Sequence, residues 1–474
     1  MPDTGMLSTS QKALAVNLDP KSYGTFAEIG GGQEVARWFF RVGGAAGTVA
    51  KTISAYDMAV SDSLYGPAER YVSRQRLEAM LAHEFRELVT GLDAARGERT
   101  TFFAFGDTVA TQSYRHPGPG RGWAGIRFQA QPREAPSEIL VHLHLRDSNA
   151  VHQQEALGLF GVNLIYAAFF HRDEPGALIR ALAEELPRNR VEIDMLKVAG
   201  PAFPGMDNRL VSLQLVERGL TDAAMFGAGG DVIQPSEVLH KQPILVERGS
   251  FRPATKLTLD LLERARDQFL QEPEVRGQTP VVLAEMTLRN LLAGGEPDHE
   301  DFLARAEVVG ALGFDVLISR FQPYYEMAEY LAAYTDGLIG LAVGLPNVRQ
   351  IADEQYYMHL PGGVLESMGR LFKRSVKMYV YPALDPATGR IVSVEGAPVP
   401  APWHHLRDLL LEIKRLEPIR NYNESYLSIH TPDVLARIER GDPSWESMVP
   451  PAVATIIKRK GLFRRNAEKA VLTA

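Results

Sequence analysis

The sequence predicts an α/β fold, with a mainly parallel sheet and flanking helices in the C-terminal half, preceded by an α+β region with antiparallel strands. Two observations carry this prediction. Between residues 243 and 382, short apolar runs alternate with helical patterns, as in a sheet whose strands are joined by helices. Between residues 100 and 200 several strand candidates follow one another, and two of them alternate polar and apolar residues as half-solvated antiparallel strands do.

The strands of the C-terminal region are predicted from nearly continuous apolar runs, which are typical of strands buried on both faces. The segments between them place apolar residues three and four apart, which indicates helices. The predicted strands are Pro243–Phe251, Pro280–Thr287, Phe314–Phe321, Gly337–Gly344 and Val376–Pro382, and the helices include Leu257–Gln271, Asp301–Leu312 and Tyr324–Tyr334. We therefore expect these strands to run in one direction.

The N-terminal region mixes strands with long helices. Strands are predicted at Thr25–Ile29, Thr101–Thr108, Gly122–Ala130, Glu138–Arg146 and Arg190–Val198, and helices at Gln33–Arg41, Val72–Gly97, Val151–Phe170 and Asp207–Leu220. A hairpin with its turn at Gly229-Gly230 is expected within Asp222–Ile233. The predicted organisation is a flexible lead-in (1–20), an α+β region (21–235), a parallel α/β domain (236–386), and a linker with a mostly helical tail (387–474).

Composition limits the classes of function. The chain has 474 residues and a net charge of −7, which argues against a general nucleic-acid binder with its usual basic excess. It has no cysteine, which excludes disulfides and thiolate chemistry and is consistent with a cytoplasmic location. The first 20 residues show no secretory signal, and no apolar run is long enough to span a bilayer. We expect a cytoplasmic protein that forms a homo-oligomer and has no nucleic-acid or membrane partner.

Polar and charged residues gather at the carboxyl ends of three successive predicted parallel strands, where open α/β sheets form their ligand crevices. Each end carries an arginine, whose fork of donors suits phosphate or carboxylate groups. The alternative is that these arginines form structural ion pairs. The predicted ligand-binding residues are Arg248, Ser250, Arg252, Thr287, Arg289, Ser319 and Arg320. They predict a small anionic molecule as partner.

Candidates for catalysis are carboxylates near these strand ends or near the glycine segments. Glu247 and Glu285 lie at the first two strand ends, and Asp57 belongs to a dense polar stretch that follows Gly43–Gly47. Gly30-Gly31-Gly32 and Gly43–Gly47 could cradle a phosphate or allow close packing, and neither segment fits a dinucleotide or P-loop motif. No complete catalytic motif is present, so the catalytic residues stay open.

His142 and His144 alternate along one predicted strand, so that both side chains point to the same face. This spacing is a recurring start of a divalent metal site, which Asp147, His152 or Glu155 could complete. The alternative is a polar, solvated face of the strand.

Several segments resemble a family of uncharacterised bacterial proteins over nearly the whole chain. They are NLDP at Asn17–Pro20, Tyr23–Phe40, Gly43–Met58, GVNLIYAAF at Gly161–Phe169 and RGSFRP at Arg248–Pro253. Members carry the label nicotinate-nucleotide adenylyltransferase or TonB-dependent receptor. The receptor label implies an export signal and a membrane barrel, neither of which this sequence predicts.

The adenylyltransferase label implies a transferase that acts on a nucleotide. Ser319–Tyr325 (SRFQPYY) resembles the G-R-F-Q-P-x-H opening of that class. Ser319 stands in place of the glycine, Tyr325 in place of the first histidine, and Met327-Ala328 in place of a later Gly-His pair. Those histidines stabilise phosphate charge during transfer, so their replacement removes an electrostatic contribution that the reaction needs.

Two hypotheses about function follow. The first is a cytoplasmic α/β protein, with transferase as the expected enzyme class, that binds a phosphorylated or carboxylated small molecule, such as a nucleotide, at the carboxyl ends of its parallel strands. The second is a non-catalytic homo-oligomeric scaffold, which surface aromatics such as Tyr356, Tyr357 and Trp403 favour. A deep pocket at the strand ends would favour the first hypothesis, and flat self-complementary surfaces would favour the second.

Overall fold

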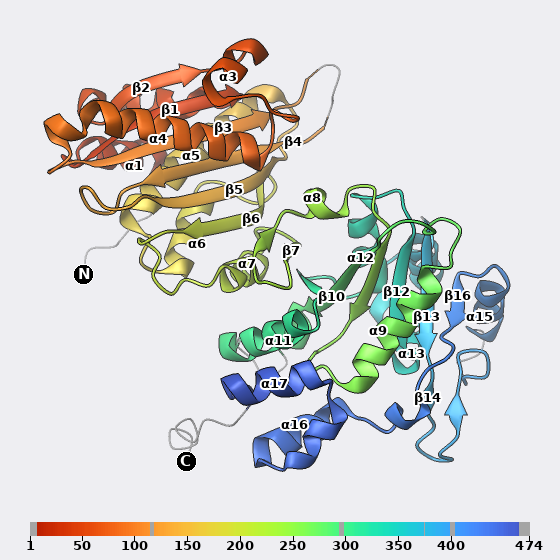
Figure 1. Cartoon of the computed structure of the whole chain (residues 1–474). Coiled ribbons are helices and arrows are strands. Elements are labelled where there is room, and N and C mark those ends of the chain that lie inside the picture. Colours follow the sequence, from red (N-terminus) through yellow and green to blue (C-terminus); the bar gives the residue numbers. More distant parts are fainter. Residues whose placement is uncertain (1–6, 114–117, 293–297, 374, 399–402, 464–474) are drawn as a thin grey trace. The chain divides into compact units, whose positions relative to one another are not determined.

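The computed structural model describes residues 7–113, 118–292, 298–373, 375–398 and 403–463. The chain divides into two compact units, Met1–Ala224 and Met225–Ala474 (Figure 1). The division lies ahead of the boundary predicted after residue 235. The reason is that β7 (Ala223–Phe226) and β8 (Val232–Ile233), the predicted hairpin, pair with each other at the edge of the second unit's sheet. The α/β class is confirmed, with sheets of mostly parallel strands flanked by helices.

The first unit contains a six-stranded sheet of order β2-β1-β3-β4-β5-β6. Its strands are β1 (Ser22–Gly30), β2 (Val49–Ser54), β3 (Thr101–Ala110), β4 (Gly120–Phe128), β5 (Ser137–Leu145) and β6 (Val191–Ala199). The antiparallel prediction is confirmed from β3 to β6. β1, for which the sequence predicted no orientation, runs parallel to both β2 and β3. The sequence did not predict β2, a half-exposed edge strand without a continuous apolar run.

Helices cover both faces of this sheet. The helical elements are α1 (Thr9–Asn17), α2 (Glu34–Arg41), the short η1 (Ala45–Gly47), α3 (Met58–Tyr65), α4 (Arg74–Arg96), α5 (Ala150–Phe170), α6 (Pro175–Ala183) and α7 (Asn208–Glu217). α4 crosses one face over β1, β3 and β4, and α1, α2, α5 and α6 pack with one another on the other face (Figure 1). A Cβ on Gly161 would lie 2.4 Å from Val35 Cγ2, so glycine is what allows α2 and α5 to approach so closely. Because both faces are covered, the strands predicted to be half-solvated are almost entirely buried.

Thr9–Asn17, part of the predicted flexible lead-in, forms the helix α1. Ser8 caps α1, and Lys12 is fully buried, with its Nζ 2.7 Å from Asn163 Oδ1 and 2.5 Å from Glu184 Oε2. The lead-in prediction is wrong here because α1 buries three polar residues (Thr9, Lys12 and Asn17) and only two small apolar ones (Ala13 and Val16), which hides its amphipathic pattern.

The second unit contains an eight-stranded sheet of order β16-β13-β12-β9-β10-β11-β7-β8. All five strands predicted here are present, and the pairs β9–β10, β10–β11, β9–β12 and β12–β13 are parallel, as predicted. One correction concerns the tail: residues 416–418 form β16, which extends the sheet beyond β13. The strands are β9 (Ile244–Arg248), β10 (Val281–Thr287), β11 (Asp315–Ser319), β12 (Ile339–Gly344), β13 (Val376–Tyr381) and β16 (Leu416–Pro418), with a separate pair β14 (Ala383–Leu384) and β15 (Ile391–Val392).

The helices of the second unit lie on both sides of its sheet. They are α8 (Pro235–Leu239), α9 (Lys256–Phe269), α10 (Leu288–Leu291), α11 (His299–Ala311), α12 (Tyr324–Ala332), α13 (Leu345–Ile351), η2 (Glu354–Tyr357), α14 (Gly363–Leu371), α15 (Trp403–Glu412), η3 (Glu424–Tyr426), α16 (Thr431–Arg440), η4 (Pro443–Met448) and α17 (Pro451–Lys460). α9 packs on the face that carries Leu245 and Ala342. Arg248 lies three residues after Leu245 and therefore points to the opposite face, where it contacts Tyr324 at the start of α12.

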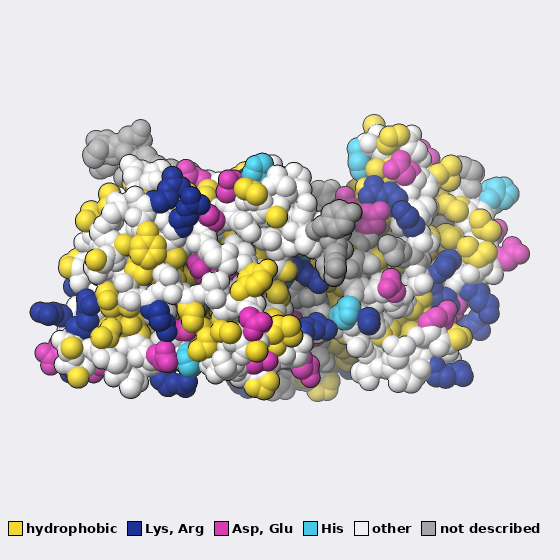
Figure 2. All heavy atoms as spheres, turned by 90° about the horizontal axis from the view of Figure 1, so that it is seen from above, with side chains coloured by type: hydrophobic (Ala, Val, Ile, Leu, Met, Phe, Trp, Pro, Cys, Tyr) yellow, Lys and Arg dark blue, Asp and Glu magenta, His cyan; other side chains and the backbone are white. Residues whose placement is uncertain are grey.

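Among the described residues, no helix is both long and apolar enough to cross a membrane. Figure 2 shows one face of the molecule, on which basic side chains are interspersed with acidic ones. No broad basic surface lies on the described residues of that face.

Candidate functional site

A cavity of about 510 Å³ opens at the carboxyl ends of β9, β10, β11 and β12. It is lined by Arg248, Gly249, Ser250, Thr287, Arg289, Asn290, Phe321, Gln322, Pro323, Tyr324, Asn347, Gln350, Ile351, Tyr356 and Tyr357. The parallel register explains this convergence, because it sets Arg248 beside Glu285 and Thr287 beside Ser319. We call this space the strand-end cavity. It contains four of the predicted ligand-binding residues, Arg248, Ser250, Thr287 and Arg289.

Arg248 forms a fixed wall of the strand-end cavity. Its Nε and Nη2 donate to the two carboxylate oxygens of Glu285 at 2.7 and 3.0 Å, and its Nη1 donates to the Gln322 carbonyl at 2.6 Å. Its guanidinium also lies 4.4 Å from the ring centre of Tyr324. Burial lowers the pKa of Arg248, but the charge and hydrogen bonds of Glu285 outweigh burial and leave this pKa above its ordinary value.

Glu285 and Ser319, which lie on two neighbouring strands, hold Arg248 in place through a chain of hydrogen bonds. The Glu285 side chain is fully buried, and the Ser319 hydroxyl donates to its Oε1 at 2.6 Å. These two predicted site residues therefore orient Arg248 and do not line the cavity. Arg248 thus forms an ion pair with Glu285, which is the structural alternative to ligand binding that the sequence left open.

Arg289 differs from Arg248 in having no carboxylate partner among the described residues. Its side chain is exposed on the rim of the cavity, where its guanidinium lies 5.9 Å from the ring centre of Tyr356. No aspartate or glutamate is among the described residues that line the cavity. Among the described residues, no carboxylate therefore neutralises the positive charge of Arg289.

Two predicted arginines lie outside the cavity. Arg252 donates from Nε to Asp301 Oδ1 at 2.5 Å, and Asp301 also binds Arg305, so the ion-pair interpretation holds for Arg252. Arg320 is exposed and does not line the cavity. Arg320 directly follows β11, and the next residue, Phe321, does line the cavity, so sequence position alone does not separate lining from non-lining residues.

The remaining catalytic candidates do not face the cavity. Glu247 is buried on the face covered by α9, its Oε2 has no hydrogen-bond partner among the described residues, and burial raises the pKa of this carboxyl well above its ordinary value. Asp57 lies in the first unit, where its side chain caps α3 by accepting from the backbone N–H groups of Ala59 and Val60.

The aromatic side of the cavity was not predicted from the sequence. Tyr324 is buried beneath Arg248, and burial raises its pKa to about 12. Asn347 Nδ2 lies 3.3 Å from the Tyr324 hydroxyl, and Tyr356 and Tyr357 complete this side. The signal that could have found Asn347 is its place just after the fourth parallel strand, at the same edge of the sheet as the arginines.

In the first unit, the glycine segment Gly30-Gly31-Gly32 follows β1 and covers a pair of buried carboxyl groups. Glu28 and Asp107 lie opposite each other on β1 and β3 and are 3% and 0% exposed. A Cβ on Gly32 would lie 2.0 Å from Asp107 Oδ2, so the segment permits close packing. Burial raises the pKa of Glu28 to about 7, and burial together with Glu28 raises that of Asp107. The close approach of Gly32 to Asp107 supports the packing interpretation of this glycine segment.

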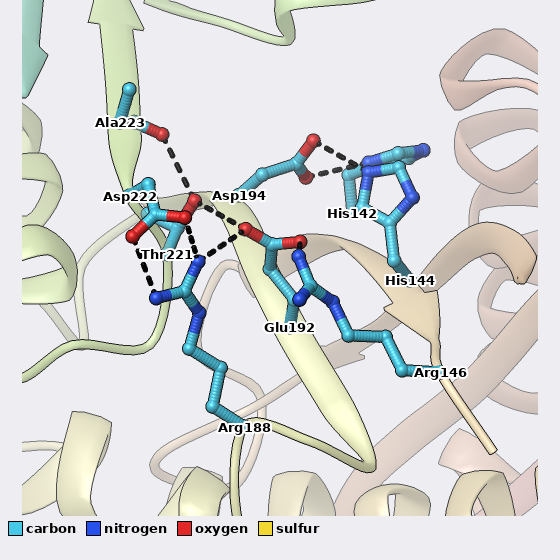
Figure 3. Close-up of polar contacts among 9 residues, drawn as sticks. All are labelled: His142, His144, Arg146, Arg188, Glu192, Asp194, Thr221, Asp222 and Ala223. Carbon is cyan, nitrogen blue, oxygen red and sulfur yellow. Dashed lines mark hydrogen bonds and ion pairs between the residues drawn. The ribbon is translucent and has the colours of Figure 1, made fainter. Parts of the chain in front are cut away.

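His142 and His144 lie next to each other and on the same side of the Asp194 carboxylate, and each contacts one of its oxygens (Figure 3). His142 Nδ1 lies 2.6 Å from Asp194 Oδ1, and His144 Nε2 lies 3.0 Å from Asp194 Oδ2. Burial alone would raise the pKa of Asp194, but the two histidines outweigh it and hold this pKa well below its ordinary value. The predicted third residues do not complete the group, since Asp147, for example, pairs with Arg190.

Comparisons with known proteins give little further information. No protein-family model matches the chain, and no curated protein does. The crystal structure of the competence/damage-inducible protein CihA from Agrobacterium tumefaciens aligns with 34% of this chain and 94% of its own, with 16% identity and a TM-score of 0.25. A CinA superfamily protein from Enterobacter cloacae aligns with 35% of this chain and 95% of its own, with 12% identity and a TM-score of 0.24. Similarity at this level carries no argument about function.

The fold and the site therefore define a class only: an α/β protein with a cavity at the carboxyl ends of its parallel strands.

Proposed function

We propose that the second unit binds a small phosphorylated or carboxylated molecule in the strand-end cavity. The observation that carries this proposal is the combination of Arg289, which has no carboxylate partner among the described residues, with a cavity whose described lining contains no acidic side chain. An anion there would form charge-assisted hydrogen bonds without displacing an existing ion pair. The hydroxyls of Ser250 and Thr287 on the same lining offer further donors.

The aromatic side of the cavity supports a ligand with a planar part. Phe321, Tyr324 and Tyr356 lie on the lining, and their rings provide apolar surface beside the two arginines. A nucleotide combines a planar base with phosphate groups and fits this division, and a transferase that acts on such a ligand is the enzyme class that we propose. The resemblance of Ser319–Tyr325 to an adenylyltransferase segment supports the same choice, because four of its residues line the cavity. A cytoplasmic location is part of the same proposal.

The first experiment identifies what the protein retains. Native mass spectrometry of the gently purified chain, followed by small-molecule analysis after denaturation, should reveal an anionic compound. Titration calorimetry with adenosine monophosphate, inorganic phosphate and citrate then separates a nucleotide from a simple phosphate or a carboxylate.

Two matched variants test the site itself. Arg289→Ala should weaken binding of the best of these probes by about 1.5–3 kcal/mol, which is roughly 10- to 150-fold, since it removes a charged hydrogen bond. Arg320→Ala removes an exposed arginine that does not line the cavity and should leave affinity unchanged. Equal effects of the two substitutions would mean that long-range charge, and not the cavity, governs binding.

A homo-oligomeric scaffold stays the second candidate. Exposed apolar side chains, among them Met358, Leu365 and Leu409, line a separate groove of about 740 Å³ together with Trp403. Sedimentation velocity measurements of the wild type and of Leu365→Asp would test self-association. A monomeric wild type would remove this candidate.

A further inference from the structure

We propose that His142, His144 and Asp194 bind a divalent first-row transition-metal ion such as Zn²⁺. One possible ligand atom from each residue lies within 4.8 Å of the other two. Two imidazoles and one carboxylate are a donor set that suits zinc and its neighbours in the first row, whereas magnesium and calcium prefer oxygen ligands alone. The site lies in the first unit and does not depend on the proposed anion cavity.

The local backbone is built to bring these three side chains together. His142 and His144 share one face of β5 because side chains alternate along a strand. On β6 the pairing shifts: His142 is opposite Met195 and Leu143 is opposite Ile193, so Asp194 is the extra residue of a β-bulge. A bulge redirects a side chain, and here it turns the Asp194 carboxylate toward both imidazoles (Figure 3). In a regular pairing Asp194 would be opposite Leu143, and its side chain would point to the other face of the sheet.

Burial and the neighbouring side chains hold the group in place. Asp194 is 2% exposed and His142 is 5% exposed, and the ring of Trp123 lies 4.9 Å from that of His142. The side chain of His144 is 24% exposed and gives the group an accessible side, through which an ion could enter. The two imidazole rings are nearly perpendicular, with centres 5.0 Å apart, so their nitrogens can approach one ion from different directions.

The next carboxylate on the same strand is already engaged. Glu192 accepts from Thr221 Oγ1 at 2.9 Å and pairs with Arg188 and Arg146 (Figure 3). Two arginines thus neutralise Glu192, whereas Asp194 contacts the two imidazoles and would supply negative charge to a cation that they bind. Three protein ligands would leave a coordination position for water or for an oxygen atom of a substrate, as in catalytic zinc sites. A metal ion would replace the hydrogen atoms that the Asp194 carboxylate now shares with the two rings.

Metal uptake by the full-length chain tests the proposal. The protein is stripped with a chelator and dialysed against ZnCl2, and its metal content is then measured by mass spectrometry. We expect one tightly held Zn²⁺ per chain. His144→Ala should weaken this binding by more than about 100-fold, because loss of a direct ligand should exceed the 10- to 100-fold effect of losing an outer-shell partner. Asp194→Asn keeps the shape and one acceptor oxygen and should also bind more weakly.

His83→Ala is the matched control. His83 also pairs with a carboxylate, Glu87, at 3.4 Å, but on the surface of a helix, so the variant should keep its zinc. If the variants of His144 and Asp194 fail to fold, a measurement on the wild-type protein still tests the proposal. X-ray absorption of the zinc-loaded protein should show two imidazoles and additional oxygen ligands. Fewer than one ion per chain, a spectrum with one imidazole or none, or folded triad variants with unchanged affinity would overturn the proposal. In each of those cases the group is a hydrogen-bonded cluster that joins β5 to β6.

Discussion

The buried pair of Glu28 and Asp107 should make the stability of the first unit depend on pH in an unusual direction. Glu28 is 3% exposed, and its pKa rises from 4.5 to about 7 on folding, with burial as the largest cause. A carboxyl whose pKa is higher in the folded state stabilises folding fully below its unfolded pKa. That contribution is lost as the pH rises from 4.5 through 7. The first unit should therefore be less stable at pH 8 than at pH 4.5 as far as Glu28 is concerned.

Glu28→Gln tests this expectation because glutamine has nearly the same shape and cannot ionise. The pKa difference of 4.5 to about 7 corresponds to about 3 kcal/mol, at roughly 1.4 kcal/mol for each tenfold change in proton affinity. The variant should be more stable than the wild type by up to this amount at pH 8 and nearly equal to it at pH 4.5. Glutamine can still accept from the Ala36 N–H group, which lies 3.5 Å from Glu28 Oε1.

Scanning calorimetry measures the difference, with hydrogen exchange in β1 to assign the transition to the first unit. An increase of about 3 kcal/mol corresponds to a rise in Tm of roughly 6–12 °C for a unit of this size. Glu69→Gln, at an exposed carboxylate, is the control and should change little at either pH. Equal stabilisation at both pH values would show that packing and not ionisation is responsible. A loss of stability at pH 8 would refute the reasoning outright.

Three further predictions concern stability and can be measured by urea unfolding. Glu285→Ala leaves the guanidinium of Arg248, whose side chain is 8% exposed, without its carboxylate, and should cost about 3–5 kcal/mol in the second unit. Lys12→Ala removes a fully buried ammonium from its amide and carboxylate partners and should cost about 1–3 kcal/mol, whereas a flexible N-terminus would show no change. Gly30→Ala should cost more than the 1–2 kcal/mol of a left-handed backbone, because its Cβ would lie 2.1 Å from a carbonyl oxygen. Gly43 has a similar positive φ, but a Cβ there would meet no atom within 4 Å, so Gly43→Ala should cost only the backbone contribution. Equal losses of stability in the two variants would show that the contact of the Gly30 Cβ with the carbonyl oxygen is not important.

The sequence predicted strands β9 to β13 of the second sheet well because each of them is a short, mainly apolar run. It failed where burial does not come from apolar side chains. The helix Thr9–Asn17 buries a lysine, and the edge strand Val49–Ser54 has no fully buried residue. Strand Leu416–Pro418 is too short to show a period. In all three cases tertiary packing, and not local pattern, decides the structure.

The candidate sites show a similar limit. Strand ends can be located from the sequence, and two arginines predicted at such ends, Arg248 and Arg289, do line the cavity. The direction in which a side chain points beyond the strand end cannot be predicted in the same way, and Arg252 and Arg320 do not line the cavity. Asp194 was missed because its position depends on a bulge, and a one-residue shift in strand pairing leaves no mark in hydrophobic periodicity.

The chain of contacts from Ser319 through Glu285 to Arg248 crosses three neighbouring strands and is complete before any ligand arrives. A molecule that entered the strand-end cavity would therefore contact Arg248, a cationic side chain that has already lost its conformational entropy during folding. Arg289, on the rim, has no such support and would lose its freedom only on binding. Recognition would then combine one arginine that is fixed in place, Arg248, with one that is mobile until the ligand binds, Arg289. Substitutions of Arg289 should alter the rate of ligand release. Substitutions of Arg248 or Glu285 should alter which ligand shapes the cavity binds.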